Sequence, residues 1–509
     1  MSGAVEMAWA ALKAEAARLD ATTLSTLFEA DPDRFDRFSA EGAGLMMDFS
    51  KEKIDRAALE ALIALARAAR VEARRDAMCA GEAINTTEGR AVLHMALRGG
   101  AGSEAAAETE TAAAERDRFL SYAEEVRRSG VADVIAIGIG GSSLGPEMAT
   151  KALAPWHDGP RVHFVSNVDG AHLGDVLKRC DPARTLVIAT SKTFTTEETM
   201  ANARAARDWL GASAGGRMAA VTAATDKAAE FGIPPERCFA MWDWIGGRYS
   251  VWSAVGLPLA IAVGAGAFRA FLDGARAMDL HFREAPLQRN LPVLMALIGI
   301  WRRNGMGCGS YALIPYDARL SRLSAWLQQL EMESNGKRVG LDGELLARAT
   351  APVVWGEPGS DAQHSFFQLL HQGTDVIPVD FILAAEPVDG LPGHHARLTA
   401  NALAQAAALA FGTPEGTEAH RVCPGDRPST MLLARRMDPA TLGAVLALME
   451  HKVFVQGTIW GINPFDQWGV ELGKVLARDV LERIESDVME GLDGSTAGLL
   501  RSVRDYGAS

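Results

Sequence analysis

Short apolar runs alternate with longer helix-like segments through the middle of the chain. Such runs are typical of buried strands, and their alternation with helices indicates a parallel sheet that is covered on both faces. In sheets of this kind, ligands bind beyond the carboxyl ends of the strands. The first set of predicted strands comprises residues 134–138, 162–166, 185–190, 218–223 and 238–242.

A second alternation occupies the later half of the chain. Alanine-rich amphipathic stretches before about Gly100 indicate helices instead. We therefore expect an α/β fold with two parallel-sheet domains and helical extensions at both ends, the N-terminal extension packing on the second, larger domain. The second set of predicted strands is 309–316, 352–356 and 375–382. The expected divisions of the chain are residues 1–100, 101–275, 276–475 and 476–509.

Composition narrows the class of protein. Of the 509 residues, 48% are hydrophobic and 23% are charged, which is typical of a soluble globular protein. The net charge of −13 argues against a nucleic-acid partner or an anionic membrane surface. Five cysteines without CxxC spacing indicate a reduced, cytoplasmic protein without a structural zinc site. The N-terminus lacks a basic segment followed by an apolar block, so we expect no secretory signal.

The longest uncharged run spans residues 251–268. It contains Pro258, several glycines and much alanine. This composition predicts a buried helix pair rather than a membrane span.

The segment IGIGGSSLGPEM (137–148) follows a predicted strand and precedes a predicted helix. Successive glycines let backbone N–H groups surround an anion, and a helix N-terminus adds partial positive charge. A dinucleotide fingerprint needs glycine where Ser143 stands, and a P-loop needs lysine where Pro146 stands. No nucleotide site is therefore indicated. The alternatives are an anion-binding loop and a tight strand-to-helix turn.

The segment TSKTFTTEETM (190–200) follows another predicted strand and concentrates hydroxyl groups. Thr195 and Glu198 fit a capping box, which accounts for one hydroxyl. Hydroxyls at a helix start suit a phosphate monoester, because phosphate offers several acceptor oxygens at once. Two adjacent glutamates count against this, yet we favour a phosphate loop over a purely structural cap. The residues that remain for it are Ser191, Lys192, Thr193 and Thr196.

The segment LSRLSAWLQQLEMESNGK (320–337) has apolar residues at helical spacing. The apolar face reaches Glu333 one turn after Leu330, and Gln329 lies four residues before Glu333. A carboxylate on such a face is partly desolvated, which raises its pKa and makes it a better proton-transfer group. The alternative is a helix-end glutamate that turns into solvent.

Three further segments carry polar candidates. In residues 359–373, His364, Gln368 and His371 are spaced as one polar stripe of a helix that Ser360 caps. The alternative for His371 is favourable placement at a helix C-terminus. A metal site at these histidines is a weaker hypothesis, because the segment has no HExxH motif and no cysteine partner.

In residues 463–479, Asn463 is the expected helix cap, and Gln467 and Lys474 are expected two turns apart on one face. Arg248 follows a Gly-Gly turn after a strand in WDWIGGRYS (242–250). The alternative for Lys474 is a solvated lysine, and the alternative for Arg248 is a surface turn. Together, an acid, a histidine, a lysine and an arginine beside two phosphate-type loops suit proton transfer on a phosphorylated metabolite without a cofactor.

Several segments are specific in combination: SKTFTTEET (191–199), GGRYSVWSAVGLP (246–258), MESNGK (332–337), FFQLLHQGT (366–374) and FVQGTIWGINPFDQWGVELGK (454–474). On these segments, and over most of its length, the chain resembles the phosphoglucose isomerase family in its bacterial form. The resemblance implies two sugar-isomerase-type (SIS) αβα sandwich domains, a homodimer, no cofactor, and interconversion of glucose 6-phosphate and fructose 6-phosphate in glycolysis and gluconeogenesis. One departure is Asp426 in GDRPS, where the family commonly has asparagine.

The resemblance also implies roles for individual residues. Glu333 matches the base that moves a proton between C1 and C2. His371 matches the ring-opening histidine, which reaches across from the partner subunit. Lys474 matches a lysine that assists at the ring oxygen, and Arg248 matches the group that stabilises charge on the enediol(ate). The expected substrate- and phosphate-binding residues are Gly141, Ser142, Ser191, Lys192, Thr193, Thr196, Gln329 and Gln467, and no metal ligand is implied.

Two other functions stay open from the sequence. One is an isomerase of the same fold that also accepts mannose 6-phosphate. The other is a non-catalytic sugar-phosphate sensor, which would not need Glu333, His371 and Lys474 together. The MESNGK segment and the full-length resemblance favour the narrower isomerase.

Overall fold

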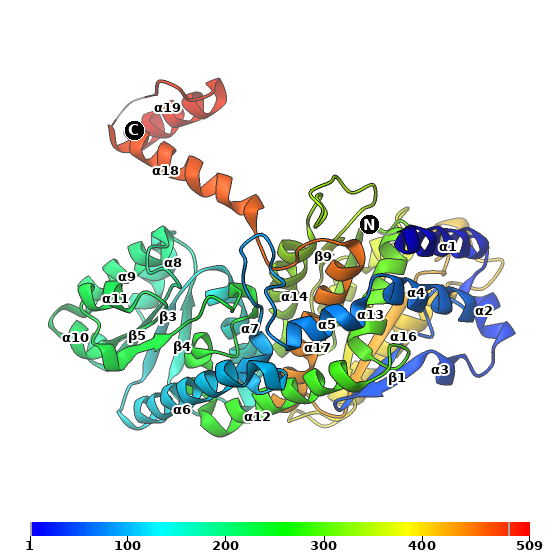
Figure 1. The fold of residues 1–509 in the computed structure, drawn as a ribbon, viewed down its shortest axis with the longest axis horizontal. Coiled ribbons are helices and arrows are strands. Elements are labelled where there is room, and N and C mark those ends of the chain that lie inside the picture. The colour runs from blue at the N-terminus through cyan, green and yellow to red at the C-terminus, as the bar shows by residue number, and fades with distance from the viewer. Residues whose placement is uncertain (1–2, 487–488, 509) are drawn as a thin grey trace. The chain divides into compact units, whose positions relative to one another are not determined.

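Two β-sheets organise the part of the chain that ends at Phe465. The computed structural model (Figure 1) describes residues 3–486 and 489–508. From Asp466 onward the chain forms a second unit, whose described residues include helices α18 (Glu471–Ser486) and α19 (Gly494–Ala508). The α/β class predicted from the sequence is confirmed.

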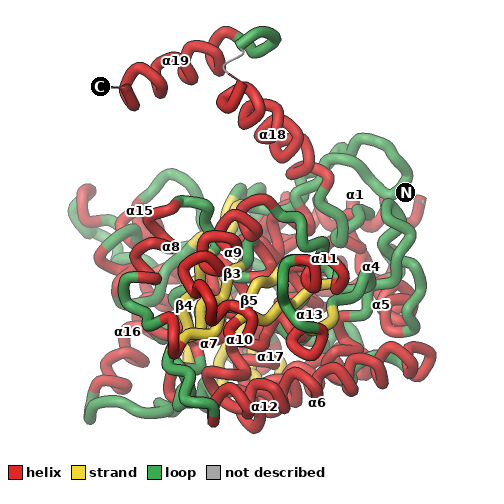
Figure 2. The backbone as a smooth tube through the Cα atoms, turned by 90° about the vertical axis from the view of Figure 1, so that its left-hand side faces the viewer, coloured by secondary structure: helices red, strands yellow, loops and turns green. Residues whose placement is uncertain are grey.

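The first sheet is parallel and has the strand order β4-β3-β5-β6-β7. Every residue of β3, β5 and β6 is buried, which explains why these strands are continuous apolar runs in the sequence. Helices α8 (Gly170–Leu177) and α9 (Glu197–Leu210) cover one face (Figure 2). The strands confirm the predicted positions: β3 (Asp133–Ile137), β4 (Arg161–Val165), β5 (Thr185–Thr190), β6 (Met218–Thr222) and β7 (Cys238–Ala240).

The direction of winding in this sheet reverses between β3 and β5. These two strands are neighbours, while β4 lies beyond β3 and β6 lies beyond β5. The loops that follow β3 and β5 therefore open side by side at the carboxyl edge. A switch point of this kind is where ligands bind in open α/β sheets.

The second sheet has the order β1-β2-β11-β10-β8-β9. Its parallel part contains the predicted strands, now β8 (Ser310–Pro315), β9 (Val353–Trp355) and β10 (Val379–Ala384). Strand β11 (Ser429–Ala434) was not predicted. Its sequence STMLLA is rich in methionine, leucine and alanine, which have no β preference of their own. Burial beside β10 determines its strand conformation.

The expectation of a purely helical N-terminal segment was wrong for residues 39–48. These residues form a hairpin, β1 (Ser39–Gly42) and β2 (Leu45–Asp48), that extends the second sheet antiparallel to β11. The rest of the segment is largely helical, as in α1 (Gly3–Leu19) and α4 (Arg56–Ala68). The predicted domain divisions stay predictions.

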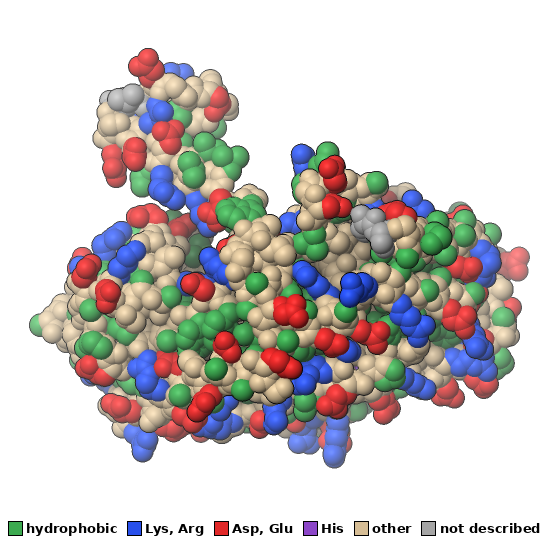
Figure 3. All heavy atoms as spheres, in the orientation of Figure 1, with side chains coloured by type: hydrophobic (Ala, Val, Ile, Leu, Met, Phe, Trp, Pro, Cys, Tyr) green, Lys and Arg blue, Asp and Glu red, His purple; other side chains and the backbone are tan. Residues whose placement is uncertain are grey.

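Two long helices lie at the centre of the core, α12 (Leu257–Glu284) and α17 (Pro439–Trp460). Among the described residues, one helical stretch, Ala254–Glu284, is apolar and long enough to cross a membrane, and 72% of its apolar window is buried. Its φ of 81° at Gly264 breaks the helical geometry, so it consists of two helices in sequence. The predicted buried helix pair is thereby confirmed. On the face seen in Figure 3, acidic and basic side chains are interspersed.

Asp426, the departure from the family pattern, has a structural role. Its φ of 54° is left-handed, a conformation that asparagine and aspartate tolerate better than most residues. One carboxylate oxygen accepts from Leu24 N at 2.9 Å, and the other lies 2.8 Å from Lys53 Nζ. The charge of Asp426 is therefore balanced by Lys53, which ties this turn to the N-terminal helices.

A buried ionic cluster joins the N-terminal segment to α12 and α17. Arg98 forms two hydrogen bonds to Asp279, each 2.7 Å, and a third of 2.7 Å to Glu450 Oε2. The Trp252 indole donates to Glu450 Oε1 at 2.7 Å. All four side chains are buried. Burial raises the pKa of Glu450 to about 7, although Arg98 and Trp252 favour its charged form.

This shift predicts a pH dependence of stability. Between about pH 4.5 and 7, the folded protein holds a proton on Glu450 that the unfolded chain releases, so the free energy of unfolding falls as pH rises through this window. A Glu450→Gln variant cannot show this fall. We expect the Tm of the wild type, measured relative to that of the variant, to decrease from pH 5 to pH 8. A difference that stays constant with pH would contradict the assignment.

Candidate active site

The loop after β3 packs closely against the turn that carries Arg248. Residues Gly140–Ser142 form a short 3-10 turn, and α7 (Leu144–Ala152) follows. A Cβ on Gly141 would lie 2.2 Å from the carbonyl of Gly247 and 2.6 Å from Arg248 N. Only glycine permits this approach of two backbones. Gly141 and Arg248 are therefore brought together, as the site predicted from the sequence requires.

The loop after β5 gathers its hydroxyl groups ahead of a helix. Ser191 Oγ lies 3.0 Å from Thr196 Oγ1, and Thr193 Oγ1 lies 2.8 Å from Thr195 Oγ1. Helix α9 begins after Thr196, whose side chain makes no capping hydrogen bond. The predicted capping box of Thr195 and Glu198 was therefore wrong, because the helix begins one residue later than that motif needs. The hydroxyl of Thr196 therefore does not cap the first N–H groups of α9.

Lys192 connects this loop to the segment before Arg248. Its Nζ lies 3.2 Å from Asp243 Oδ1, with a longer contact of 3.5 Å to the Asp243 carbonyl. Asp243 is 77% exposed, so this pair is readily exchanged for a dianionic ligand. Phe194 has a φ of 51° and is buried, which fixes the loop between its polar neighbours.

Glu333 lies at the end of a helix whose last turns are widened. An α-helical segment, α14 (Leu323–Leu327), continues as a π-helical turn over Gln328–Glu333. Such turns are frequent at functional sites because they displace side chains from the regular helical spacing. Glu333 Oε2 lies 3.4 Å from Arg248 Nη1, and the Glu333 side chain is 22% exposed. The alternative of a glutamate turned fully into solvent is excluded by this contact.

The π-turn places a second glutamate that sequence reasoning missed. Glu331 is completely buried, and its Oε2 accepts from Tyr311 OH at 2.5 Å and from Lys452 Nζ at 2.9 Å. Regular α-helical spacing puts Leu330 and Glu333 on the apolar face and gives no reason to bury Glu331. The Glu331–Lys452 pair anchors the turn that presents Glu333.

Arg248 is held rigidly beside Glu333. Its Nε donates to Ser334 Oγ at 2.7 Å, and its Nη2 donates to the Pro464 carbonyl at 2.8 Å. Only 5% of the residue is exposed, so the surface turn considered from the sequence is wrong. A buried guanidinium beside a largely buried carboxylate can stabilise negative charge that develops on a bound molecule.

Gln329 faces the first loop. A Cβ on Gly140 would lie 3.0 Å from Gln329 Nε2, which puts the amide directly against the glycine backbone. Gln329 Oε1 is buried and has no hydrogen-bond partner among the described residues. An unsatisfied buried amide oxygen next to an anion-type loop is a candidate acceptor for a substrate hydroxyl. The structure thus brings together Gly141, Gln329, Glu333 and Arg248.

His371 lies in a different place. It belongs to α15 (Phe367–Gln372), and its Nε2 lies 2.7 Å from Gln405 Oε1. The predicted continuous helix was wrong, because a 3-10 turn (Asp361–His364) ends before α15 begins, and the expected stripe with His364 does not form. His371 lines an open groove of about 550 Å³ together with Gln368, the other residue of the expected stripe. Glu333, Arg248 and the two phosphate-type loops do not line this groove.

Gln467 and Lys474 belong to the second unit. The helix expected from Asn463 was wrong: a 3-10 turn begins at Trp468, and α18 follows at Glu471. Asn463 Oδ1 accepts from Phe465 N at 3.1 Å in a local turn. Lys474 is exposed, and its Nζ lies 2.8 Å from Glu471 Oε1. The roles of Gln467 and Lys474 stay predictions.

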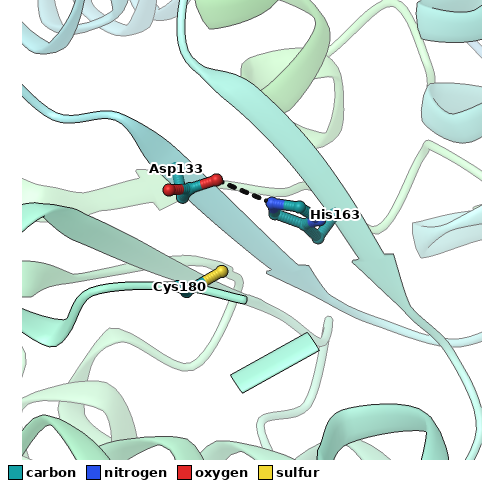
Figure 4. Close-up of side chains that lie close together, drawn as sticks. All are labelled: Asp133, His163 and Cys180. Atoms are coloured by element: carbon teal, nitrogen blue, oxygen red, sulfur yellow. Dashed lines mark hydrogen bonds and ion pairs between the residues drawn. The ribbon is translucent and has the colours of Figure 1, made fainter. Parts of the chain in front are cut away.

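Among the described residues, one group of three possible metal ligands lies close together (Figure 4): Asp133, His163 and Cys180, with ligand atoms within 4.8 Å of one another. Asp133 already bonds to His163 Nε2 at 2.8 Å and to Arg161 Nη2 at 2.9 Å. The cluster lies at the first residue of β3, whereas the candidate site begins after its last. These residues therefore stabilise the amino end of β3 and are not part of the candidate active site.

A larger cavity of about 610 Å³ lies beyond the carboxyl ends of β8 and β10. None of the predicted site residues lines it. Its acidic side chains are largely engaged, Asp389 with Arg319 and Glu386 with two arginines. Size alone therefore does not identify the chemical site in this fold.

Comparison with known proteins agrees with this geometry. The family described as phosphoglucose isomerase matches residues 48–500 of the chain. The chain belongs to the phosphoglucose isomerase family. The match covers both sheets except strand β1 and all but the last residue of β2, and it includes Glu333, Arg248 and the two loops.

Members of this family from several bacteria are similar to the chain over nearly its whole length. The glucose-6-phosphate isomerase of Brucella ovis is 52% identical, with 93% of each chain covered. That of Xanthobacter autotrophicus is 53% identical, covering 92% of this chain and 93% of its own. A glucose-6-phosphate isomerase crystal structure from Chlamydia trachomatis has a TM-score of 0.89 at 35% identity, with 98% of each chain covered.

Proposed function

We propose that this protein interconverts glucose 6-phosphate and fructose 6-phosphate in the cytoplasm, as a homodimer without a cofactor. Besides family membership, one observation supports the proposal. The Glu333 carboxylate lies 3.4 Å from the buried Arg248 guanidinium, beside the glycine loop that follows β3. Moving a carbonyl group between C1 and C2 requires a base for the proton and a positive group for the oxygen. Glu333 and Arg248 supply these two functions.

The phosphate group holds the end of the sugar that does not react. Ser191, Thr193 and Thr196 present hydroxyls, Lys192 presents a positive charge, and the N-terminus of α9 adds N–H groups. Gly141 and Ser142 contribute from the neighbouring loop. Anchoring at C6 orients C1 and C2 toward Glu333, so binding energy at a remote group serves the reacting centre.

Ring opening requires further groups. We propose that His371 of the partner subunit enters this site, because His371 within one chain lines a separate groove with Gln405. Lys474 assists at the ring oxygen, and Gln329 and Gln467 position the sugar hydroxyls. The unsatisfied Oε1 of Gln329 supports this role for Gln329.

The proposal is tested by supplying fructose 6-phosphate and detecting glucose 6-phosphate through a coupled dehydrogenase. We expect steady turnover by the purified chain. Mannose 6-phosphate is the second substrate: conversion at a comparable rate would show the dual-specificity isomerase instead. Binding of either sugar phosphate without turnover would show the non-catalytic sensor and overturn the proposal.

A Thr193→Val variant tests the phosphate loop. Removing one hydrogen bond to a charged group raises KM by roughly tenfold to a hundredfold, with kcat less affected. The matched control is Thr111→Val, another exposed threonine, whose hydroxyl donates to the Ala107 carbonyl of its own helix. A change in thermal stability without a change in KM would show that Thr193 is structural.

A further inference from the structure

Ser334 lies between the two residues of the Arg248–Tyr249 pair. The side chain is completely buried, and its Oγ accepts from Arg248 Nε at 2.7 Å. Tyr249 OH lies 3.1 Å from the same oxygen. One hydroxyl therefore contacts both residues, immediately after Glu333 in the chain.

The guanidinium of Arg248 has only donors, and their directions are fixed by its plane. Two of its nitrogens donate to buried acceptors: Nε donates to Ser334 Oγ, and Nη2 donates to the Pro464 carbonyl. The third nitrogen, Nη1, faces Glu333. Two anchors on one planar group set its orientation, so the direction of Nη1 depends on both of them.

Tyr249 is itself held in place. Its ring stacks on His94 with 4.8 Å between centroids and an interplanar angle of 26°. Both residues are buried. Burial lowers the pKa of His94 well below its ordinary value, so the ring beneath Tyr249 is neutral. Burial likewise raises the pKa of Tyr249, which keeps its hydroxyl protonated. The hydroxyl that touches Ser334 is thus a fixed, neutral group.

We infer that Ser334, held by Tyr249, is a positioning residue that orients the Arg248 guanidinium toward Glu333 and the reacting oxygens. The inference rests on the proposed isomerase function. Ser334 touches neither reacting carbon, and it acts through Arg248. Without its oxygen, the Nε–H group loses a buried acceptor, and the guanidinium plane is held less firmly although Nη2 still bonds to the Pro464 carbonyl. Loss of this orientation weakens stabilisation of the transition state, where the negative charge is greatest, more than it weakens substrate binding.

The test compares Ser334→Ala with Ser324→Ala. Both serines are buried on the same helical segment, and Ser324 Oγ donates to the Leu313 carbonyl at 3.3 Å, away from Arg248. We expect Ser334→Ala to lower kcat by roughly tenfold to a hundredfold with KM changed by less than about threefold. Ser324→Ala is expected to lower the Tm and to leave kcat near wild type. Equal kcat in wild type and Ser334→Ala would overturn the inference.

A double-mutant cycle separates positioning from a general structural effect. In an Arg248→Lys background, Ser334→Ala is expected to cost kcat little more, because the group it orients is already gone. The same fold-loss in both backgrounds would show that Ser334 does not act through Arg248. If Ser334→Ala does not fold, Tyr249→Phe removes the single oxygen that hydrogen-bonds to both Ser334 and Arg248. An unchanged kcat in Tyr249→Phe then counts against the inference.

The two proposals fail in different ways. A wild-type chain that does not isomerise fructose 6-phosphate overturns the proposed function. An active wild type whose Ser334→Ala variant keeps its kcat overturns only the positioning role.

Discussion

Glu333→Gln lowers isomerisation by ~10²–10⁴-fold, the range expected when a general base is lost. Glutamine keeps the shape of the side chain and its place beside Arg248, so substrate binding changes little. The loss therefore appears in kcat, with KM near that of the wild type. The measurement is steady-state turnover of fructose 6-phosphate.

The matched control is Glu344→Gln, which neutralises an exposed glutamate that is not among the predicted site residues. This variant should retain wild-type kcat, which excludes a general effect of lost negative charge. Near-normal turnover by Glu333→Gln would remove Glu333 from the mechanism. A large rise in KM with unchanged kcat would assign it to substrate binding instead.

Mixed dimers of Glu333→Gln and His371→Ala chains recover activity that neither variant has alone. If His371 serves the site of the partner subunit, one site of the mixed dimer carries both lesions and the other carries neither. Random reassortment gives about half mixed dimers, so activity reaches about a quarter of wild type. The experiment unfolds and refolds the two variants together and compares them with each refolded alone.

Differently tagged chains confirm that mixed dimers have formed before activity is measured. If His371 acts within its own chain, every site carries one lesion and nothing is regained. Confirmed mixed dimers without any gain in activity would rule out the shared site. A chain that remains a monomer throughout would contradict the dimer itself.

The hydrophobic pattern of the sequence was sufficient to predict a strand where every residue of that strand is buried. Strand β5 (Thr185–Thr190) was predicted at its observed residues because all of them are buried between two strands and two layers of helices. The hairpin of β1 and β2 could not be predicted in this way. Its strand conformation depends on pairing with β11, where Met47 pairs with Leu432, nearly four hundred positions away.

The site was predicted less completely than the sheets. Residue types and loop positions indicated Glu333, Arg248 and the hydroxyl loop, because the carboxyl ends of strands and the end of an apolar helix face are local features. The π-turn was not predictable from spacing, since it depends on the buried Glu331–Lys452 pair between distant segments. The anchoring of Arg248 by Ser334 and the Pro464 carbonyl is likewise a tertiary feature.

The central claim is that Glu333 moves a proton between C1 and C2 of a bound sugar phosphate. The most direct measurement is isomerisation of fructose 6-phosphate in deuterium oxide, with the product examined by proton NMR. A carboxylic acid that is 22% exposed exchanges its proton with solvent, so the account predicts deuterium at C2 of the glucose 6-phosphate formed by the wild type. The Glu333→Gln variant is expected to introduce almost none in the same time. Efficient conversion by the wild type with no deuterium at C2, even after many turnovers, would contradict proton transfer through Glu333.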